Sequence, residues 1–182
     1  MTTNNKIELM APAGNFESLQ AGLDNGADSV YFGVEQLNMR ARATVNFTMD
    51  DLKEIARRCE EKNVRSYLTL NTIIYDHDLS VVKTLLAKAK EANITAVIAS
   101  DQAVIAMARG IGMEVHISTQ LNITNIETIK FYSLFADTMV LSRELSLRQV
   151  KKITEQIEKE QIKGPNGKLV EIEIFGHGAL CM

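Results

Sequence analysis

The chain has 182 residues, of which 46% are hydrophobic and 24% are charged, so it is long enough to bury a hydrophobic core. Its formal net charge of −3 provides no general attraction for nucleic acid. No run of 18 apolar residues is present, so we expect no membrane span. The first residues lack a basic, apolar leader, so we expect no secretory signal. Two distant cysteines do not make a disulfide framework, which predicts reduced thiols and a cytoplasmic location.

Short apolar segments alternate with amphipathic segments along the whole chain. Seven segments have the composition of buried strands, namely 7–10, 29–33, 65–70, 96–99, 114–118, 138–142 and 171–175. The first is followed by a turn of small residues at 11–14. Strands that alternate with helices predict a parallel sheet with right-handed crossovers.

Helix start signals lie between the predicted strands. The expected caps are Asn15, Thr48 with Asp51, Ser100, Thr124 with Glu127, and Ser146 with Gln149. The helix after Thr48 carries an apolar stripe that includes Leu52, Ile55 and Cys59, so Cys59 is interpreted as a core thiol. A helix with Leu79, Val82, Leu86 and Ala89 on one face is expected before 96–99.

Two architectures are compatible with this order. A doubly wound open sheet needs a glycine-rich nucleotide loop after its first strand, and the turn here reads APAGNFES rather than GxGxxG. The sequence therefore favours a TIM-type (β/α) barrel, in which functional groups follow the strands. We expect a single domain, 1–182, with about seven parallel strands and no eighth to close it. Its open edges invite pairing, so a homo-oligomer is one expected assembly.

Polar side chains follow several predicted strands, where a barrel would gather them at one mouth. The candidate substrate-binding residues are Asn71, Gln120, Asn122, Arg143 and Glu144, and the candidate catalytic residues are His116 and His177. A satisfied structural network is the alternative for His116, because buried polar groups need partners. A simple ion pair is the alternative for Arg143 and Glu144.

The connection from Gly33 to Thr48 is long for a loop between a strand and a helix. It contains Arg40 and Arg42, whose guanidinium groups suit a carboxylate or a phosphate. We expect either a substrate-binding lid or a solvated surface loop.

Standard hydrolytic motifs are absent from the sequence. It contains neither the HExxH zinc motif nor the GxSxG nucleophile elbow. The histidines at 77, 116 and 177 also lack the spacing of a metal finger. These residues by themselves do not predict a peptidase.

The chain nevertheless resembles the amino-terminal part of U32-family proteins, often described as collagenase-like peptidases. Four segments carry the resemblance: LMAPAGNFESL (9–19), VHISTQLNITN (115–125), LSREL (141–145) and EIFGHGALCM (173–182). In the family the last motif continues into a serine-glycine-cysteine segment with further cysteines. This sequence stops before them, so we expect a truncated domain.

The resemblance implies two activities of different kinds. One is proteolysis of a peptide substrate. The other is oxygen-independent hydroxylation, either of an RNA base in tRNA or rRNA or of a quinone precursor. We favour this second activity as the mechanism. A small anionic co-substrate is a further expected ligand. The second activity uses a 4Fe-4S cluster held by four cysteines. A scaffold that only presents a surface to partners is the third hypothesis.

The family counterpart of Cys181 is the first of the four cluster ligands. One thiolate cannot hold a four-iron cluster, and Cys59 is expected to face a core. The resemblance therefore implies a cluster in the full-length protein, and no cluster in the 182 residues alone.

Overall fold

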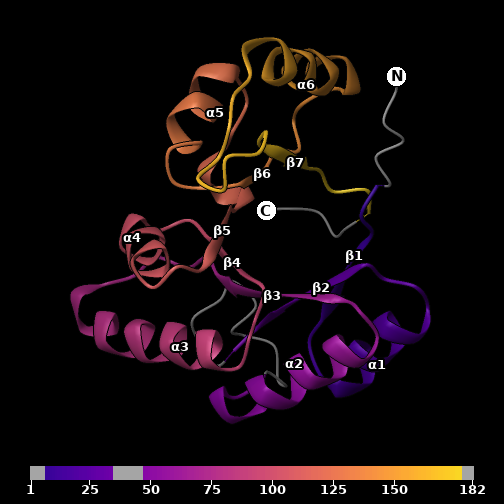
Figure 1. The fold of residues 1–182 in the computed structure, drawn as a ribbon, viewed down its shortest axis with the longest axis vertical. Coiled ribbons are helices and arrows are strands. Elements are labelled where there is room, and N and C mark those ends of the chain that lie inside the picture. The colour runs from indigo at the N-terminus through magenta and orange to yellow at the C-terminus, as the bar shows by residue number, and fades with distance from the viewer. Residues whose placement is uncertain (1–6, 35–46, 178–182) are drawn as a thin grey trace. The chain divides into compact units, whose positions relative to one another are not determined.

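The computed structural model describes residues 7–34 and 47–177 (Figure 1). The strands within these ranges are β1 (Met10–Ala13), β2 (Ser29–Gly33), β3 (Arg65–Leu70), β4 (Ala96–Ala99), β5 (Glu114–Ile117), β6 (Thr138–Val140) and β7 (Glu171–Glu173). The α-helices are α1 (Phe16–Asp24), α2 (Leu52–Glu61), α3 (Leu79–Glu91), α4 (Gln102–Gly110), α5 (Ile126–Tyr132) and α6 (Leu147–Glu160). Short 3₁₀ turns are η1 (Met49–Asp51), η2 (Asp76–Asp78) and η3 (Thr119–Leu121). Over these two ranges, no helix is both long and apolar enough to cross a bilayer.

The strands follow one another in the sheet in chain order, from β1 to β7. The pairs β1–β2, β2–β3, β5–β6 and β6–β7 are parallel. Strands in sequence order with a helix between them have the topology of a (β/α) barrel. The predicted fold class, an incomplete TIM-type barrel with seven strands, is confirmed. The chain divides into two compact units, Met1–Val97 and Ile98–Met182, and the single domain stays a prediction.

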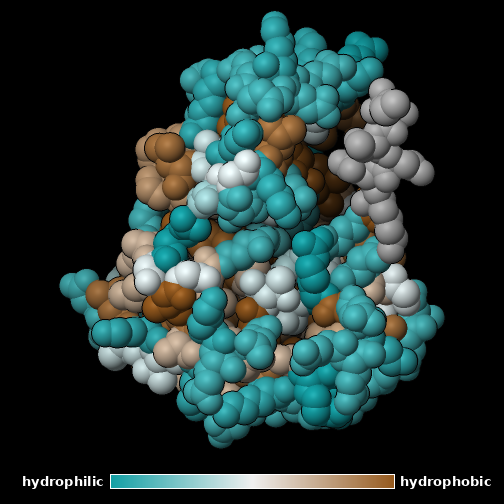
Figure 2. Space-filling view, in the orientation of Figure 1, coloured by the Kyte–Doolittle hydropathy of each residue, from teal (hydrophilic) through white to brown (hydrophobic). Residues whose placement is uncertain are grey.

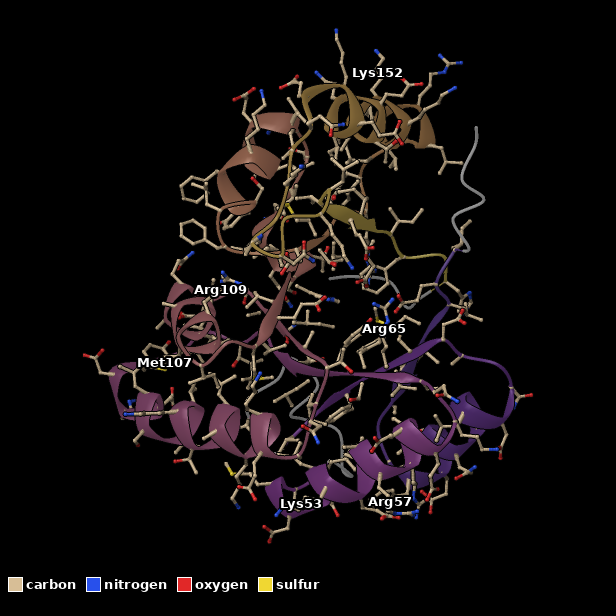
Figure 3. All side chains as sticks on the ribbon, in the orientation of Figure 1. Lys53, Arg57, Arg65, Met107, Arg109 and Lys152 are labelled. Carbon is tan, nitrogen blue, oxygen red and sulfur yellow. The ribbon has the colours of Figure 1, made fainter. Side chains whose placement is uncertain are left out.

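In the first unit, the helices α1, α2 and α3 lie along one side of β1 to β3 (Figure 1). Phe32 of β2 and Leu68 of β3 are fully buried, as is Leu52 of α2. The outer face of α2 is charged instead. Lys53 binds Glu91 of α3 at 2.8 Å, and Figure 3 shows Lys53 and Arg57 pointing outward from the helix.

In the second unit, β5 and β6 bury Val115, Ile117 and Met139 completely. The helices α5 and α6 are joined by an ion pair between Lys130 and Glu160 at 2.7 Å. Figure 2 shows a hydrophilic surface over α6 and a hydrophobic patch over α5. The exposed apolar residues of that region are Phe131, Leu134 and Phe135.

The first strand lies three residues later than predicted. β1 is Met10–Ala13 rather than 7–10, and the turn predicted at 11–14 is largely strand. Before Met10 the chain is held to the turn that precedes β2, because Leu9 accepts hydrogen bonds from the backbone of Asp28 and Ser29. Pro12 lacks a donor, and it is tolerated because β1 lies at an edge of the sheet.

Three of the predicted caps are confirmed. Asn15 forms a capping box with Ser18, and Ser146 forms one with Gln149. Thr48 and Asp51 also form a capping box, but around η1, which leads into α2. The sequence signal therefore marked the start of each helical segment, and the short 3₁₀ turn before α2 was not expected.

Two caps are shifted by one residue. The N-cap of α4 is Asp101 rather than Ser100, and its carboxylate accepts from the Ala103 N–H at 2.7 Å. The N-cap of α5 is Asn125 rather than Thr124, and it accepts from Thr128 at 3.0 Å. The strands β5, β6 and β7 also end one or two residues earlier than predicted.

A test of the packing before β7 uses Gly164. A Cβ atom at this position would lie 2.6 Å from Oδ1 of Asp137 and 2.9 Å from its Cα. Because Asp137 is buried and held in hydrogen bonds, it cannot move away freely. Gly164→Ala should lower the free energy of unfolding by about 1–3 kcal/mol in urea titrations followed by circular dichroism.

The matched control is Gly110→Ala at the end of α4. No atom lies within 4 Å of a Cβ built there. Alanine also favours helix over glycine by up to about 1 kcal/mol, so this variant should be neutral or more stable. Equal effects of the two substitutions would contradict the packing described here.

Candidate functional site

A row of polar side chains marks the end of β5. His116 is only 3% exposed, and the buried Ser118 follows it. The Ser118 hydroxyl donates to Oε1 of Gln120 in η3. Asn122 ends η3 with a left-handed φ of 50°, a conformation that asparagine tolerates. Gln120 and Asn122 are thus placed on the same exposed turn.

The loop between β6 and α6 presents a cation at the end of β6. The buried Ser142 donates a hydrogen bond to the carboxylate of Glu144. This bond, the Glu144 backbone N–H and the charge of Arg143 together hold the pKa of Glu144 below its usual range. The Arg143 guanidinium carbon lies 4.4 Å from the centre of the Phe175 ring, which is a cation–π contact.

A pocket of about 260 Å³ lies at these loops within the second unit. It is lined by Leu141, Ser142, Arg143, Leu145, Leu147, Val150, Ile174, Phe175, Gly176 and His177. Six of the ten lining residues are apolar, and Arg143 and His177 contribute the basic groups. The Phe175 side chain is 39% exposed, so the ring is accessible.

Toward the start of β5, His116 contacts a carboxyl group. Its Nε2 lies 3.0 Å from Oε1 of Glu114. Burial raises the pKa of Glu173, and the charge of His116 opposes this effect. The sequence interpretation missed Glu114, Glu173 and Phe175. The signal for Glu114 is its position two residues before His116 on one strand, which places both side chains on the same face. Glu173 and Phe175 have the same spacing, but β7 ends at Glu173, so alternation along the strand does not extend to Phe175.

The structure brings together some of the predicted site residues. Arg143 and His177 share the pocket, whereas Glu144 is held by Ser142 and does not line it. Asn71 follows β3 in the first unit and is half-buried. Arg40, Arg42 and Cys181 lie outside the described residues. Their predicted roles stay predictions.

The described residues do not offer a metal or cluster site. Throughout 7–34 and 47–177, no group of three or more His, Cys, Asp or Glu side chains could hold a metal ion. Cys59 is buried on α2, and burial raises the pKa of its thiol to about 11. A protonated thiol is a poor ligand, so Cys59 is the core thiol that its apolar stripe indicated.

Comparisons with known proteins agree with this fold. The sequence profile of peptidase family U32 matches residues 14–182. A collagenase of Porphyromonas gingivalis is 55% identical over 178 residues, which cover 98% of this chain and 43% of the relative. The tRNA hydroxylation protein P1 of Bacillus subtilis is 30% identical over 180 residues, which cover 97% of this chain and 40% of the relative.

A solved structure of a U32 peptidase matches with a TM-score of 0.69 over 96% of this chain and 69% of that chain. The two sequences are only 13% identical, so this likeness supports the fold alone. The chain spans about two fifths of the length of the curated relatives described above.

The raised pKa of Glu173 has a consequence for stability that depends on pH. A carboxyl group whose pKa is raised by folding favours the folded state below its unfolded pKa. That contribution is lost as the pH rises through the folded pKa, because the buried anion is then unfavourable. Above neutral pH, the free energy of unfolding of Glu173→Gln should therefore exceed that of wild type by on the order of 1 kcal/mol. In acid the two proteins should differ little.

The control is Glu171→Gln, two residues earlier on β7, where the side chain is exposed. Urea unfolding of the three proteins across the pH range measures both effects. A pH-independent difference between Glu173→Gln and wild type would rule out the buried carboxyl as its cause.

Proposed function

This chain belongs to peptidase family U32, and we propose that it supplies the substrate-binding part of an enzyme that hydroxylates a base of RNA. The names of several relatives support an RNA substrate, since they are tRNA hydroxylation proteins. The observation that carries the proposal is the contact between Arg143 and Phe175 at the pocket.

A guanidinium beside an exposed aromatic ring is a surface on which an unpaired base can stack. The ring supplies a flat apolar face, and Arg143 adds a positive charge that suits a neighbouring phosphate. The remaining apolar wall would exclude water from the bound base. His177, on the pocket rim, can contact a polar group of the nucleotide.

The other predicted residues have proposed roles in the same reaction. Ser142 orients Glu144 and so fixes the short loop from which Arg143 reaches Phe175. The amides of Gln120 and Asn122 would bind base edges or the ribose. Asn71, in the first unit, stays a predicted substrate-binding residue. Arg40 and Arg42 would bind phosphate or a small anionic co-substrate. In this proposal His116 and His177 are the residues that move protons.

An iron–sulfur cluster belongs to the proposed mechanism only in the full-length protein. The sequence has two cysteines, of which Cys59 is a buried thiol on α2. The described residues therefore do not fit a cluster, and no step is routed through one. In the full-length protein we propose Cys181 as one ligand, with the other thiolates supplied from outside this chain.

Proteolysis is the second candidate. It is favoured by the 55% identity to a protein named collagenase, which exceeds the identity to the tRNA hydroxylation proteins. The contact between His116 and Glu114 could orient an imidazole as a general base for hydrolysis. A non-catalytic scaffold would use neither this histidine nor the pocket.

Arg143→Met in the full-length protein tests the proposed site. Stacking on a guanidinium or a ring contributes about 1–3 kcal/mol per base, so hydroxylation should fall by about 5- to 150-fold. The protein is purified without oxygen, or returned to a strain that lacks the gene. Hydroxylated nucleosides are then measured by mass spectrometry, and cleavage of gelatin is measured in parallel.

The matched control is Arg148→Met on α6. Arg148 is exposed, does not line the pocket, and lies one turn from Lys152, which points into solvent in Figure 3. It should keep wild-type activity. Gelatin cleavage by cluster-free protein without any nucleoside product would favour the protease, and no activity in either assay would favour the scaffold.

Cys181→Ser tests the proposed ligand. In the full-length protein it should lower the iron and acid-labile sulfide content, because one thiolate of the cluster is lost. Cys59→Ala is the control and should leave both contents unchanged. Full iron loading in Cys181→Ser would mean that this thiol has another role, as would a cluster in the 182 residues alone.

A further inference from the structure

The end of α5 presents an apolar surface in the second unit. Phe131 is 57% exposed, Leu134 is 69% exposed and Phe135 is 39% exposed. The ring centres of Phe131 and Phe135 lie 5.7 Å apart in an edge-to-face contact, so the two rings form one cluster. Figure 2 shows hydrophobic residues gathered over α5, beside the hydrophilic surface of α6. These three residues are called the α5 patch.

The backbone holds the α5 patch outward. After α5 the chain turns back on the helix, because the N–H groups of Phe135 and Ala136 both donate to the Tyr132 carbonyl at 2.9 Å. On the inner side, Ile129 and Ala136 are fully buried. Turning the patch inward would therefore expose Ile129, so the local fold itself leaves the patch open.

The charges beside the patch favour an apolar partner over an anionic one. Lys130, the residue before Phe131, is paired with Glu127 at 2.8 Å and with Glu160 at 2.7 Å. A phosphate or an anionic membrane surface would have to compete with both carboxylates for this cation. Aromatic side chains with few charges among them are instead typical of the centre of a protein–protein interface.

The area of the patch suits contact within one polypeptide. An aromatic side chain has about 150–250 Å² of surface, so with Leu134 the patch exposes on the order of 300 Å². A stable interface between separate proteins buries about 800 Å² on each partner, so this patch alone is too small for a stable dimer. Two parts of one polypeptide need less area, because their linker keeps them at an effective concentration of about 1 mM or more.

The relatives contain a part that could cover the patch. This chain covers 43% of the Porphyromonas gingivalis relative and 40% of the Bacillus subtilis relative, so more than half of each lies outside the matched segment. We propose that, in the full-length protein, the part outside these 182 residues packs on the α5 patch through an apolar segment of its own. The proposal goes beyond the proposed function and does not depend on it, because a hydroxylase, a protease and a scaffold would all use this contact.

The first test is hydroxyl-radical footprinting of the full-length protein, read by mass spectrometry. Phe131 and Phe135 should lose most of the oxidation that they show in the urea-unfolded protein. Tyr75, which is 60% exposed in the first unit, is the internal reference and should keep its oxidation. Equal oxidation of Phe131 and Tyr75 would overturn the proposal, since the patch would then be open to solvent.

Protection of the patch is measured over a range of protein concentrations, with sedimentation in parallel. Packing within one polypeptide should protect Phe131 equally in dilute and concentrated protein. Protection that disappears on dilution, as a dimer dissociates, would mean that a second copy occupies the patch. That result would also overturn the proposal.

The second test is limited proteolysis of full-length variants whose fold is checked by circular dichroism. Loss of a large side chain from the centre of an interface changes the equilibrium about tenfold, so Phe131→Gln should speed cleavage between the two parts by about that factor. Leu134→Gln is a second variant at a more exposed position and should act in the same direction. Ile73→Gln, at a site in the first unit that is 76% exposed, is the matched control and should leave the rate unchanged. Wild-type cleavage in both α5 variants would refute the docking.

Discussion

The second unit depends on the hydrogen bonds of one buried residue, Asp137. Its N–H donates to Val115 of β5 at 3.2 Å, and its C=O accepts from Glu171 of β7 at 2.9 Å. Its carboxylate accepts from the Asn166 N–H at 2.9 Å, which holds the turn that leads into β7. One residue thus joins two strands and a turn, and it determines where β7 begins to pair.

That register decides the chemistry of the site. A slip of one residue would turn every β7 side chain to the opposite face of the sheet. Glu173 would then leave the face that carries His116, and Phe175 could no longer meet Arg143 in the same way. The pocket and the buried carboxyl group are therefore two results of the same strand pairing, because Glu173 and Phe175 lie two residues apart.

The (β/α) barrel topology is shared by enzymes with unrelated activities, so it does not select between hydroxylation and proteolysis. The site gives more information. An exposed ring next to a guanidinium suits a flat base, whereas the dyad of His116 and Glu114 suits proton transfer in either reaction. The choice between the two therefore depends on what binds to Arg143 and Phe175.

The sequence by itself determined the order of strands and helices, because periodicity and capping are local: Asn15 and Ser18, or Ser146 and Gln149, are three residues apart. Its prediction of Ser100 as a cap was wrong by one residue, since Ser100 and Asp101 can both accept the bond and only the backbone geometry selects Asp101. It predicted Arg143 and His177 as site residues, and both line the pocket, although their roles stay predictions. Only the tertiary structure decided the contact of Arg143 with Phe175 and the placement of Glu173 near His116, because the hydrogen-bond register of β5, β6 and β7 joins residues far apart in the chain.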